Sequence, residues 1–171
     1  MKRLTLLRHA KSSWENTRLG DHDRPLSARG ERDAPKMGAR LLARRARPSL
    51  IISSSATRAF MTAKQVAEAL SYPAEFLQTD RALYLASPRE ILDLVGSQED
   101  NFFDLLIVGH NPGLTDLANE LLPGLGLDNL PTAGVVAMQF ATLKWSELAQ
   151  SDATLLYYDY PKNPELLLIE D

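Results

Sequence analysis

The chain has 171 residues, which is close to the usual size of a single domain and long enough to bury a full core. Its net charge of -3 offers no general electrostatic attraction to nucleic acid, so we expect no nucleic-acid partner. The absence of cysteine excludes disulfides, thiolate metal sites and a cysteine nucleophile.

The N-terminus does not predict export. Its basic start imitates a signal peptide, but charged residues from Arg8 onward break the apolar stretch, which is too short for that purpose. No stretch approaches the roughly 20 apolar residues that span a bilayer. We therefore expect a cytoplasmic protein with no membrane partner.

Apolar runs alternate with helical patterns along the chain, which is typical of βαβ units and a largely parallel sheet. The first run, residues 4–7, predicts a buried strand that ends on Arg8 and His9. We expect the polar loop that follows, residues 11–25, to pass over the mouth of a pocket.

A helix is predicted over residues 27–45, with Met37, Leu41 and Leu42 on its inner face. Because proline lacks a backbone N–H, Pro35 predicts a kink in this helix or a late start.

The second apolar run, residues 50–52, leads through three serines into a predicted helix over residues 56–70. This places Arg58 in the first helical turn. A short strand is predicted at residues 76–78.

A third helix is predicted over residues 88–95, because Ser87 and Glu90 have the spacing of a capping box. The next apolar run, residues 105–108, predicts a buried strand that leads through a glycine to His110.

Asn111 and Pro112 predict the start of another helix, with Asn111 as its cap and Pro112 at its first position. The last third reads as strands over residues 135–140, 154–158 and 166–169, some of them antiparallel at the sheet edge. We therefore expect an α/β protein with three α/β/α layers, in which a mostly parallel mixed sheet carries helices on both faces.

Four polar side chains lie at or beyond the ends of predicted parallel strands, where the ligand crevice of such a sheet lies. His9 and His110 should therefore face one pocket, with Arg8 and Arg58 beside them. This pattern contains no carboxylate, so it suits an anion, and phosphate matches the planar donor fork of arginine. Burying Arg8 without a partner would be costly, which also favours an anionic ligand.

Four segments in this order carry a resemblance to a known family: LRHAKS at 7–12, DRPLS at 23–27, SSATRA at 54–59 and VGHNPG at 108–113. The chain resembles the histidine phosphatase superfamily, which has the phosphoglycerate mutase-like fold. Within that superfamily it is similar to the small SixA-type phosphohistidine phosphatases. The resemblance implies a single histidine phosphatase domain over residues 1–171.

The resemblance also implies roles for the site residues. His9 would take the phosphoryl group as a covalent phosphohistidine, Arg8 and Arg58 would spread its charge, and His110 would donate to a phosphoryl oxygen. Further phosphate or substrate contacts are expected from Arg24, Ser12, Asn111 and Thr132. Water would then release phosphate, and the reaction would require no metal and no cofactor.

The leaving group decides which substrate fits. Ester-cleaving members of the superfamily place a general acid between the second and last segments, and Tyr84 stands in that place here. Asp80 and Glu90 remain alternatives for such an acid. A phosphohistidine needs none, because its leaving imidazole, with a reference pKa of about 6.5, can already carry a proton on the far nitrogen.

The sequence therefore predicts a phosphohistidine phosphatase that acts on a phosphorelay or phosphotransfer protein. The alternatives are a phosphomonoesterase or mutase for a small phosphorylated metabolite, and a non-catalytic phosphate-binding protein. A metal site of His9, His22 and His110 is rejected, because no histidine pair has ligand spacing.

Two further groups are interpreted as solvated. His22 lies in a polar loop among charged residues, and no pattern supports a role for it. The basic cluster is interpreted as an exposed helix face, with docking of an acidic partner as the minor alternative. Its members are Arg40, Arg44, Arg45 and Arg47.

Overall fold

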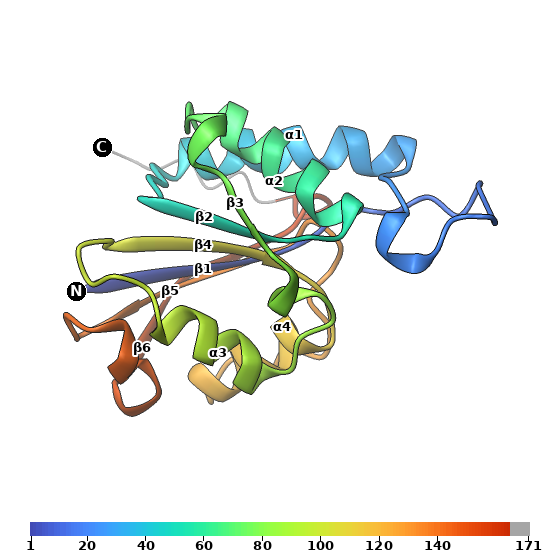
Figure 1. The fold of residues 1–171 in the computed structure, drawn as a ribbon. Helices are drawn as coiled ribbons and strands as arrows, with labels where there is room; N and C mark the ends of the chain where they lie inside the picture. The colour runs from blue at the N-terminus through green and yellow to red at the C-terminus, as the bar shows by residue number, and fades with distance from the viewer. Residues whose placement is uncertain (165–171) are drawn as a thin grey trace.

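In the computed structural model, which describes residues 1–164, a mixed sheet of six strands lies between two layers of helices (Figure 1). Its strand order is β3-β2-β4-β1-β5-β6. The strands are β1 (Lys2–Arg8), β2 (Leu50–Ser54), β3 (Gln78–Asp80), β4 (Asp104–Gly109), β5 (Val135–Phe140) and β6 (Ala153–Asp159).

Strands β1 to β4 are parallel, whereas β5 runs antiparallel to β1 and β6 antiparallel to β5. The predicted mostly parallel mixed sheet with antiparallel strands at one edge is thus confirmed. The short strand β3 lies two residues later than predicted, because a turn of 3-10 helix occupies Ala74–Phe76. The strand predicted at 166–169 lies outside the described residues.

Helices cover both faces of the sheet, with α1 (Ala28–Ala43) and α2 (Thr57–Ala69) on one side and α3 (Pro88–Gly96) and α4 (Gly113–Leu121) on the other (Figure 1). A hydrophobic core lies on each face of the sheet, and alternate residues of the central strands point into one core or the other. Leu6 belongs to the core under α3 and α4, whereas Leu7 belongs to the core under α1 and α2. Burial on both faces explains the continuous apolar runs seen in the sequence.

Helix α1 begins where its cap predicts, with the Ser27 hydroxyl accepting a hydrogen bond from the Gly30 N–H at 3.2 Å. The late start is therefore wrong: Pro35 lies inside the helix on its exposed side, where water can satisfy the carbonyl that proline leaves unpaired. Leu42 is also a correction. It is exposed, whereas Met37 of the same helix is fully buried.

The predicted capping box of α3 is confirmed, since Ser87 and Glu90 exchange two hydrogen bonds of 3.2 Å. The start of α4 differs from the prediction, because Pro112 is its cap and Asn111 precedes it. The Asn111 side chain accepts from the Thr115 hydroxyl at 2.9 Å and donates to the Leu130 carbonyl at 2.9 Å. It therefore ties the start of α4 to the loop before β5.

The basic cluster is only partly solvated. Arg40 and Arg44 both pair with the buried carboxylate of Asp159, at 3.0 and 3.3 Å, and so attach β6 to α1. Arg45 and Arg47 are exposed, as predicted. A membrane-crossing helix does not occur among the described residues, whose helices are too short or too polar.

Candidate active site

The carboxyl ends of β1, β2 and β4 bring the predicted side chains to one edge of the sheet. The parallel register sets Arg8 of β1 beside Gly109 of β4, so the histidines that follow these residues become neighbours. They border a cavity of about 180 Å³. All the predicted site residues line this cavity: Arg8, His9, Ser12, Arg24, Arg58, His110, Asn111 and Thr132.

The cavity is also lined by residues that the sequence argument did not assign. They are Lys11, Trp14 and Leu85. Trp14 stacks on the guanidinium of Arg24 at 3.5 Å yet is 68% exposed, and Leu85 is 58% exposed. Exposed large apolar side chains beside a polar cavity indicate a binding surface. The sequence alone does not show that Trp14 and Leu85 lie at the same cavity.

His9 is buried and held in one tautomer. Its Nδ1–H donates to the carbonyl of Ala10 at 2.7 Å, since a carbonyl can only accept. This leaves Nε2 unprotonated, and Arg58 Nε lies 3.4 Å from it. The Ala10 N–H is anchored on the Thr62 hydroxyl at 3.0 Å, so the residue that orients the imidazole is itself fixed by α2.

His110 lies beside His9, with 5.1 Å between the ring centroids. Its Nε2 is 2.7 Å from the Ser54 hydroxyl, and its Nδ1 is 3.5 Å from Arg58 Nη2. Because the guanidinium can only donate, Nδ1 accepts in this arrangement and Nε2–H donates to Ser54.

The surroundings of both imidazoles disfavour their protonation. Burial, with the nearby charges of Arg58 and Arg8, lowers the pKa of His9 to about 4. Burial, together with His9 and Arg58, lowers the pKa of His110 to about 3. Both rings are therefore neutral at neutral pH, and a neutral imidazole with a free nitrogen is a competent nucleophile.

A pH titration followed by NMR tests this electrostatic account. We expect the ring signals of His9 and His110 to stay constant from about pH 8 to about pH 5, whereas an unperturbed histidine titrates near pH 6.5. Because the pKa values are lowered, protonation and loss of nucleophilicity are expected only as the pH falls through about 4. A midpoint near 6.5 for His9, assigned by comparison with a His9→Gln variant, would contradict it.

Three guanidiniums converge on the cavity. Arg58 is only 3% exposed, and Arg24 donates to the Ser12 hydroxyl at 2.7 Å. Arg8 donates to the Leu130 carbonyl at 2.9 Å, but its buried Nε has no partner, which is true of no other buried side-chain nitrogen or oxygen in residues 1–164. An anion bound between these groups would satisfy that donor.

No carboxylate lines the cavity, as expected, but one that the sequence argument did not assign contacts two of these arginines from outside it. Asp21 accepts from Arg24 at 3.1 Å, from Arg58 at 2.9 Å and from the Tyr84 hydroxyl at 2.5 Å. The hydrogen bond from Tyr84 and the Arg58 guanidinium hold the pKa of Asp21 well below its usual range. The position of Asp21 three residues before Arg24 was the available sequence signal, since such pairs meet within one helical turn.

His22 is also a correction, because it is not simply solvated. Its Nε2 lies 2.8 Å from the Ser55 hydroxyl, and its ring packs edge-on against Tyr84, with 4.9 Å between the centroids. The short 3-10 helix Asp21–Asp23 thereby docks on the start of α2. This contact depends on the path of a long loop, which local sequence patterns do not predict.

The two carboxylates considered as general acids are occupied elsewhere. Asp80 accepts from the Ala82 N–H at 2.8 Å, and Glu90 accepts from the Ser87 N–H in the capping box. Neither lines the cavity.

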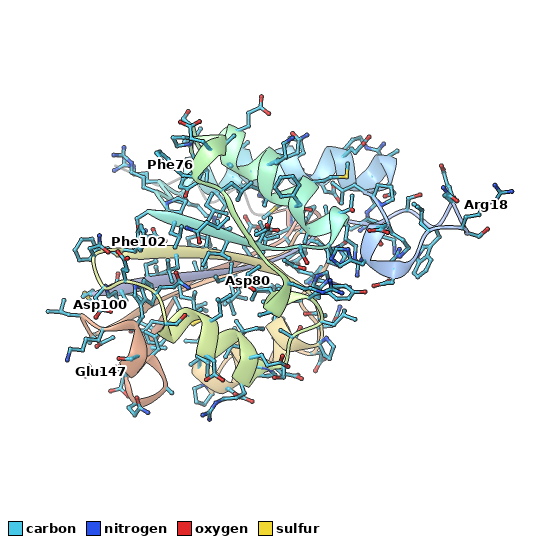
Figure 2. The ribbon with its side chains drawn as sticks, viewed as in Figure 1. Arg18, Phe76, Asp80, Asp100, Phe102 and Glu147 are labelled. Carbon is cyan, nitrogen blue, oxygen red and sulfur yellow. The ribbon has the colours of Figure 1, made fainter. Side chains whose placement is uncertain are left out.

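The loop of residues 11–25 borders the cavity and is fixed at both ends. The Lys11 carbonyl accepts from the Ser27 N–H at 2.8 Å, and a Cβ on Gly30 would overlap that carbonyl, so α1 can approach the loop only with glycine there. Figure 2 shows Arg18 at the outer end of the loop, pointing away from the sheet. The residues near the cavity are thus held, while the tip projects outward.

Thr132, just before β5, also lines the cavity. The next residue, Ala133, has a left-handed backbone with φ of 60° and donates its N–H to the His9 carbonyl at 3.1 Å. A non-glycine residue in this conformation is uncommon, and such residues cluster at functional sites.

This fold, with two buried histidines at its strand ends and three arginines around the same cavity, defines a class of protein. The chain belongs to the histidine phosphatase superfamily, branch 1, whose family model matches residues 4–82. An uncharacterized protein of Mycobacterium tuberculosis is 31% identical over 165 residues, which cover 91% of this chain and 100% of that protein.

Solved structures share the whole fold. A protein from Nakamurella multipartitia, assigned as the phosphohistidine phosphatase SixA, is 26% identical with a TM-score of 0.80, covering 94% of this chain and 96% of that chain. The protein histidine phosphatase SixA complexed with tungstate has a TM-score of 0.80 at 18% identity, covering 95% and 99% of the chains. The predicted superfamily and phosphoglycerate mutase-like fold are therefore confirmed.

Proposed function

We propose that the protein is a phosphohistidine phosphatase that removes phosphate from a histidine on a phosphotransfer protein, with His9 as the nucleophile. The unprotonated Nε2 of His9 attacks phosphorus, a P–N bond forms, and the P–N bond to the substrate imidazole breaks. The leaving nitrogen takes the bonding electron pair, and the substrate imidazole departs neutral because its other nitrogen carries a proton.

Water completes the cycle. It attacks the phosphorus of phosphorylated His9, its proton goes to the released phosphate, and the electron pair of the P–N bond returns to Nε2. His9 leaves as a neutral ring because Nδ1 keeps its proton on the Ala10 carbonyl. The donors of Arg8, Arg24 and Arg58 would stabilise the phosphoryl oxygens during both displacements.

His110 is proposed to donate a hydrogen bond to a phosphoryl oxygen. For its Nδ1 to donate to a phosphoryl oxygen, the ring must hold its proton there instead of on Nε2. The Ser54 hydroxyl, 2.7 Å from Nε2, can support this tautomer by donating rather than accepting. We therefore assign Ser54 to the control of the His110 proton.

The observation that carries the substrate class is the absence of a carboxylic acid in the cavity. Among residues 1–164, no aspartate or glutamate lines it, and Asp21, which pairs with two of its arginines, has a pKa well below its usual range. Expelling an alkoxide from a phosphate ester needs a proton donor, whereas expelling an imidazole does not. The cavity of about 180 Å³ is also below the usual size of a small-molecule site, about 300 Å³ or more.

A comparison of leaving groups tests this proposal. We expect phosphate release from a phosphotransfer domain phosphorylated on histidine to exceed release from an alkyl phosphate by about 10²–10⁴ in kcat/KM, the usual contribution of a general acid. Equal turnover of both substrates would contradict the acid-free reaction. Loss of alkyl phosphatase activity in Asp80→Asn or Glu90→Gln would then identify the acid.

The exposed rim of the cavity suits a macromolecular substrate. Replacing Trp14 by alanine is expected to raise KM for a phosphohistidine protein about tenfold, because exposed aromatic side chains often dominate such interfaces. Phosphoramidate, a substrate too small to contact the rim, serves as a check that Arg24, on which Trp14 stacks, is still correctly placed. Its KM should change much less.

Phe76 offers a matched control. It is a similarly exposed aromatic residue, and Figure 2 places it at the other end of the molecule from the loop tip. Phe76→Ala should leave KM for the protein substrate unchanged. An equal rise of KM for phosphoramidate and for the protein in Trp14→Ala would contradict a docking role for Trp14.

A further inference from the structure

Asp21 joins two of the arginines that line the cavity. One carboxylate oxygen accepts from Arg24 Nε and Nη2 at 3.2 and 3.1 Å, and the other accepts from Arg58 Nη2 at 2.9 Å. The main-chain carbonyl of Asp21 accepts from Arg58 Nη1 at 2.6 Å. The hydroxyl of Tyr84 completes this set of donors.

The carboxylate contacts the arginines from outside the cavity. Arg24 and Arg58 line the cavity, whereas Asp21 and Tyr84 do not. Asp21 is 44% exposed and Arg58 is 3% exposed, so Asp21 closes the outer side of a buried guanidinium. On the cavity side Arg58 makes only the long contacts with His9 and His110, which a phosphoryl group would replace.

We infer that Asp21 is a positioning residue, which holds Arg24 and Arg58 in the orientation that binds the phosphoryl group. Arg58 depends on Asp21 most, because apart from the side chain and carbonyl of Asp21 it has only long contacts, with His9 at 3.4 Å and His110 at 3.5 Å. Arg24 has a second anchor in the Ser12 hydroxyl at 2.7 Å. Charge-assisted pairs are the strong hydrogen bonds of a protein, and small displacements of catalytic groups are costly to rate.

An inhibitory role for Asp21 would change the kinetics in the opposite direction. If the Asp21 carboxylate competed with the phosphoryl group for the arginines, its removal would strengthen phosphate binding and raise kcat/KM. A positioning role requires the reverse, because a guanidinium without its anchor loses alignment in the transition state. The inference rests on the proposed function, since it assumes that Arg24 and Arg58 bind the phosphoryl group.

Asp21→Asn tests the inference, because it keeps the shape of the side chain and removes its charge. We expect kcat on a histidine-phosphorylated phosphotransfer domain to fall between about tenfold and about 100-fold. Asp23→Asn is the matched control, since Asp23 lies in the same turn, is exposed, and has its carboxylate beside His22 rather than beside an arginine. It should retain the wild-type kcat. An unchanged or higher kcat in Asp21→Asn would overturn the inference.

A second measurement, which does not depend on phosphatase activity, tests the positioning role of Asp21 separately from the proposed function. In a ¹⁵N–¹H NMR spectrum, the Arg58 Nε–H of the folded wild-type protein should give a distinct signal, which collapses to the averaged position of mobile arginines in Asp21→Asn. Arg58→Lys identifies that signal. If the wild type fails to hydrolyse phosphohistidine, the proposed function fails and the NMR result alone decides: a collapsed signal supports positioning, and an unchanged signal overturns it.

Discussion

His9→Ala is expected to abolish phosphate release, with a loss of about 10⁴-fold or more, as for other enzymes that lose their nucleophile. The reason is geometric, since His9 is the ring whose free Nε2 faces the arginine donors while its Nδ1 is bound to a backbone carbonyl. We do not expect His110 to replace it, because the Ser54 hydroxyl occupies its Nε2 and the proposed reaction uses its Nδ1 as a donor to the phosphoryl group.

Trapping of the intermediate measures this prediction directly. After a brief exposure to radiolabelled phosphohistidine protein, the wild type should carry label that is stable to base and lost in acid, and His9→Ala should carry none. His22→Ala is the matched control, because His22 does not line the cavity, and it should still become labelled. Label on His9→Ala at the wild-type level would show that another residue is the nucleophile.

Arg58→Ala is expected to lower kcat by about 10²–10³-fold, the range found when one preorganised donor of an anionic transition state is removed. Arg58 is the side chain that contacts both imidazoles and Asp21, so its loss removes a phosphoryl donor and frees the carboxylate. Arg58→Lys should recover little of this rate, because an ammonium lacks the planar fork that addresses two acceptors at once.

The rate must be measured on folded protein, so the unfolding midpoint of each variant is determined beside kcat. Arg89→Ala serves as the matched control, because Arg89 lies exposed on α3 and does not touch the catalytic cavity. It should behave as the wild type does. A kcat for Arg58→Ala within tenfold of the wild type would exclude a major role for this guanidinium in phosphoryl stabilisation.

The sequence predicted the sheet and the meeting of the histidines because both depend on strong local patterns. A buried parallel strand needs a continuous apolar run, and the ends of parallel strands share one edge of the sheet. His9 and His110 could therefore be placed together without knowledge of any loop. The helix boundaries were close for the same reason, since caps such as Ser27 are local.

The errors concern contacts between distant parts of the chain. Asp21 contacts Arg58 of α2 and His22 contacts Ser55 just before it, through a loop whose path no periodic pattern describes, so the carboxylate beside the arginines was not foreseen. Likewise, Arg40 and Arg44 have the spacing of an exposed helix face, and only the fold shows that both pair with the buried Asp159. Charge pairing of this kind depends on tertiary structure rather than on local sequence.

The most direct test of the proposed activity is the rate at which the wild-type protein removes label from a phosphotransfer domain phosphorylated on histidine. The account predicts loss far faster than spontaneous hydrolysis, with stoichiometric release of inorganic phosphate. Loss at the spontaneous rate, in a preparation that hydrolyses small phosphate esters, would contradict the phosphohistidine assignment.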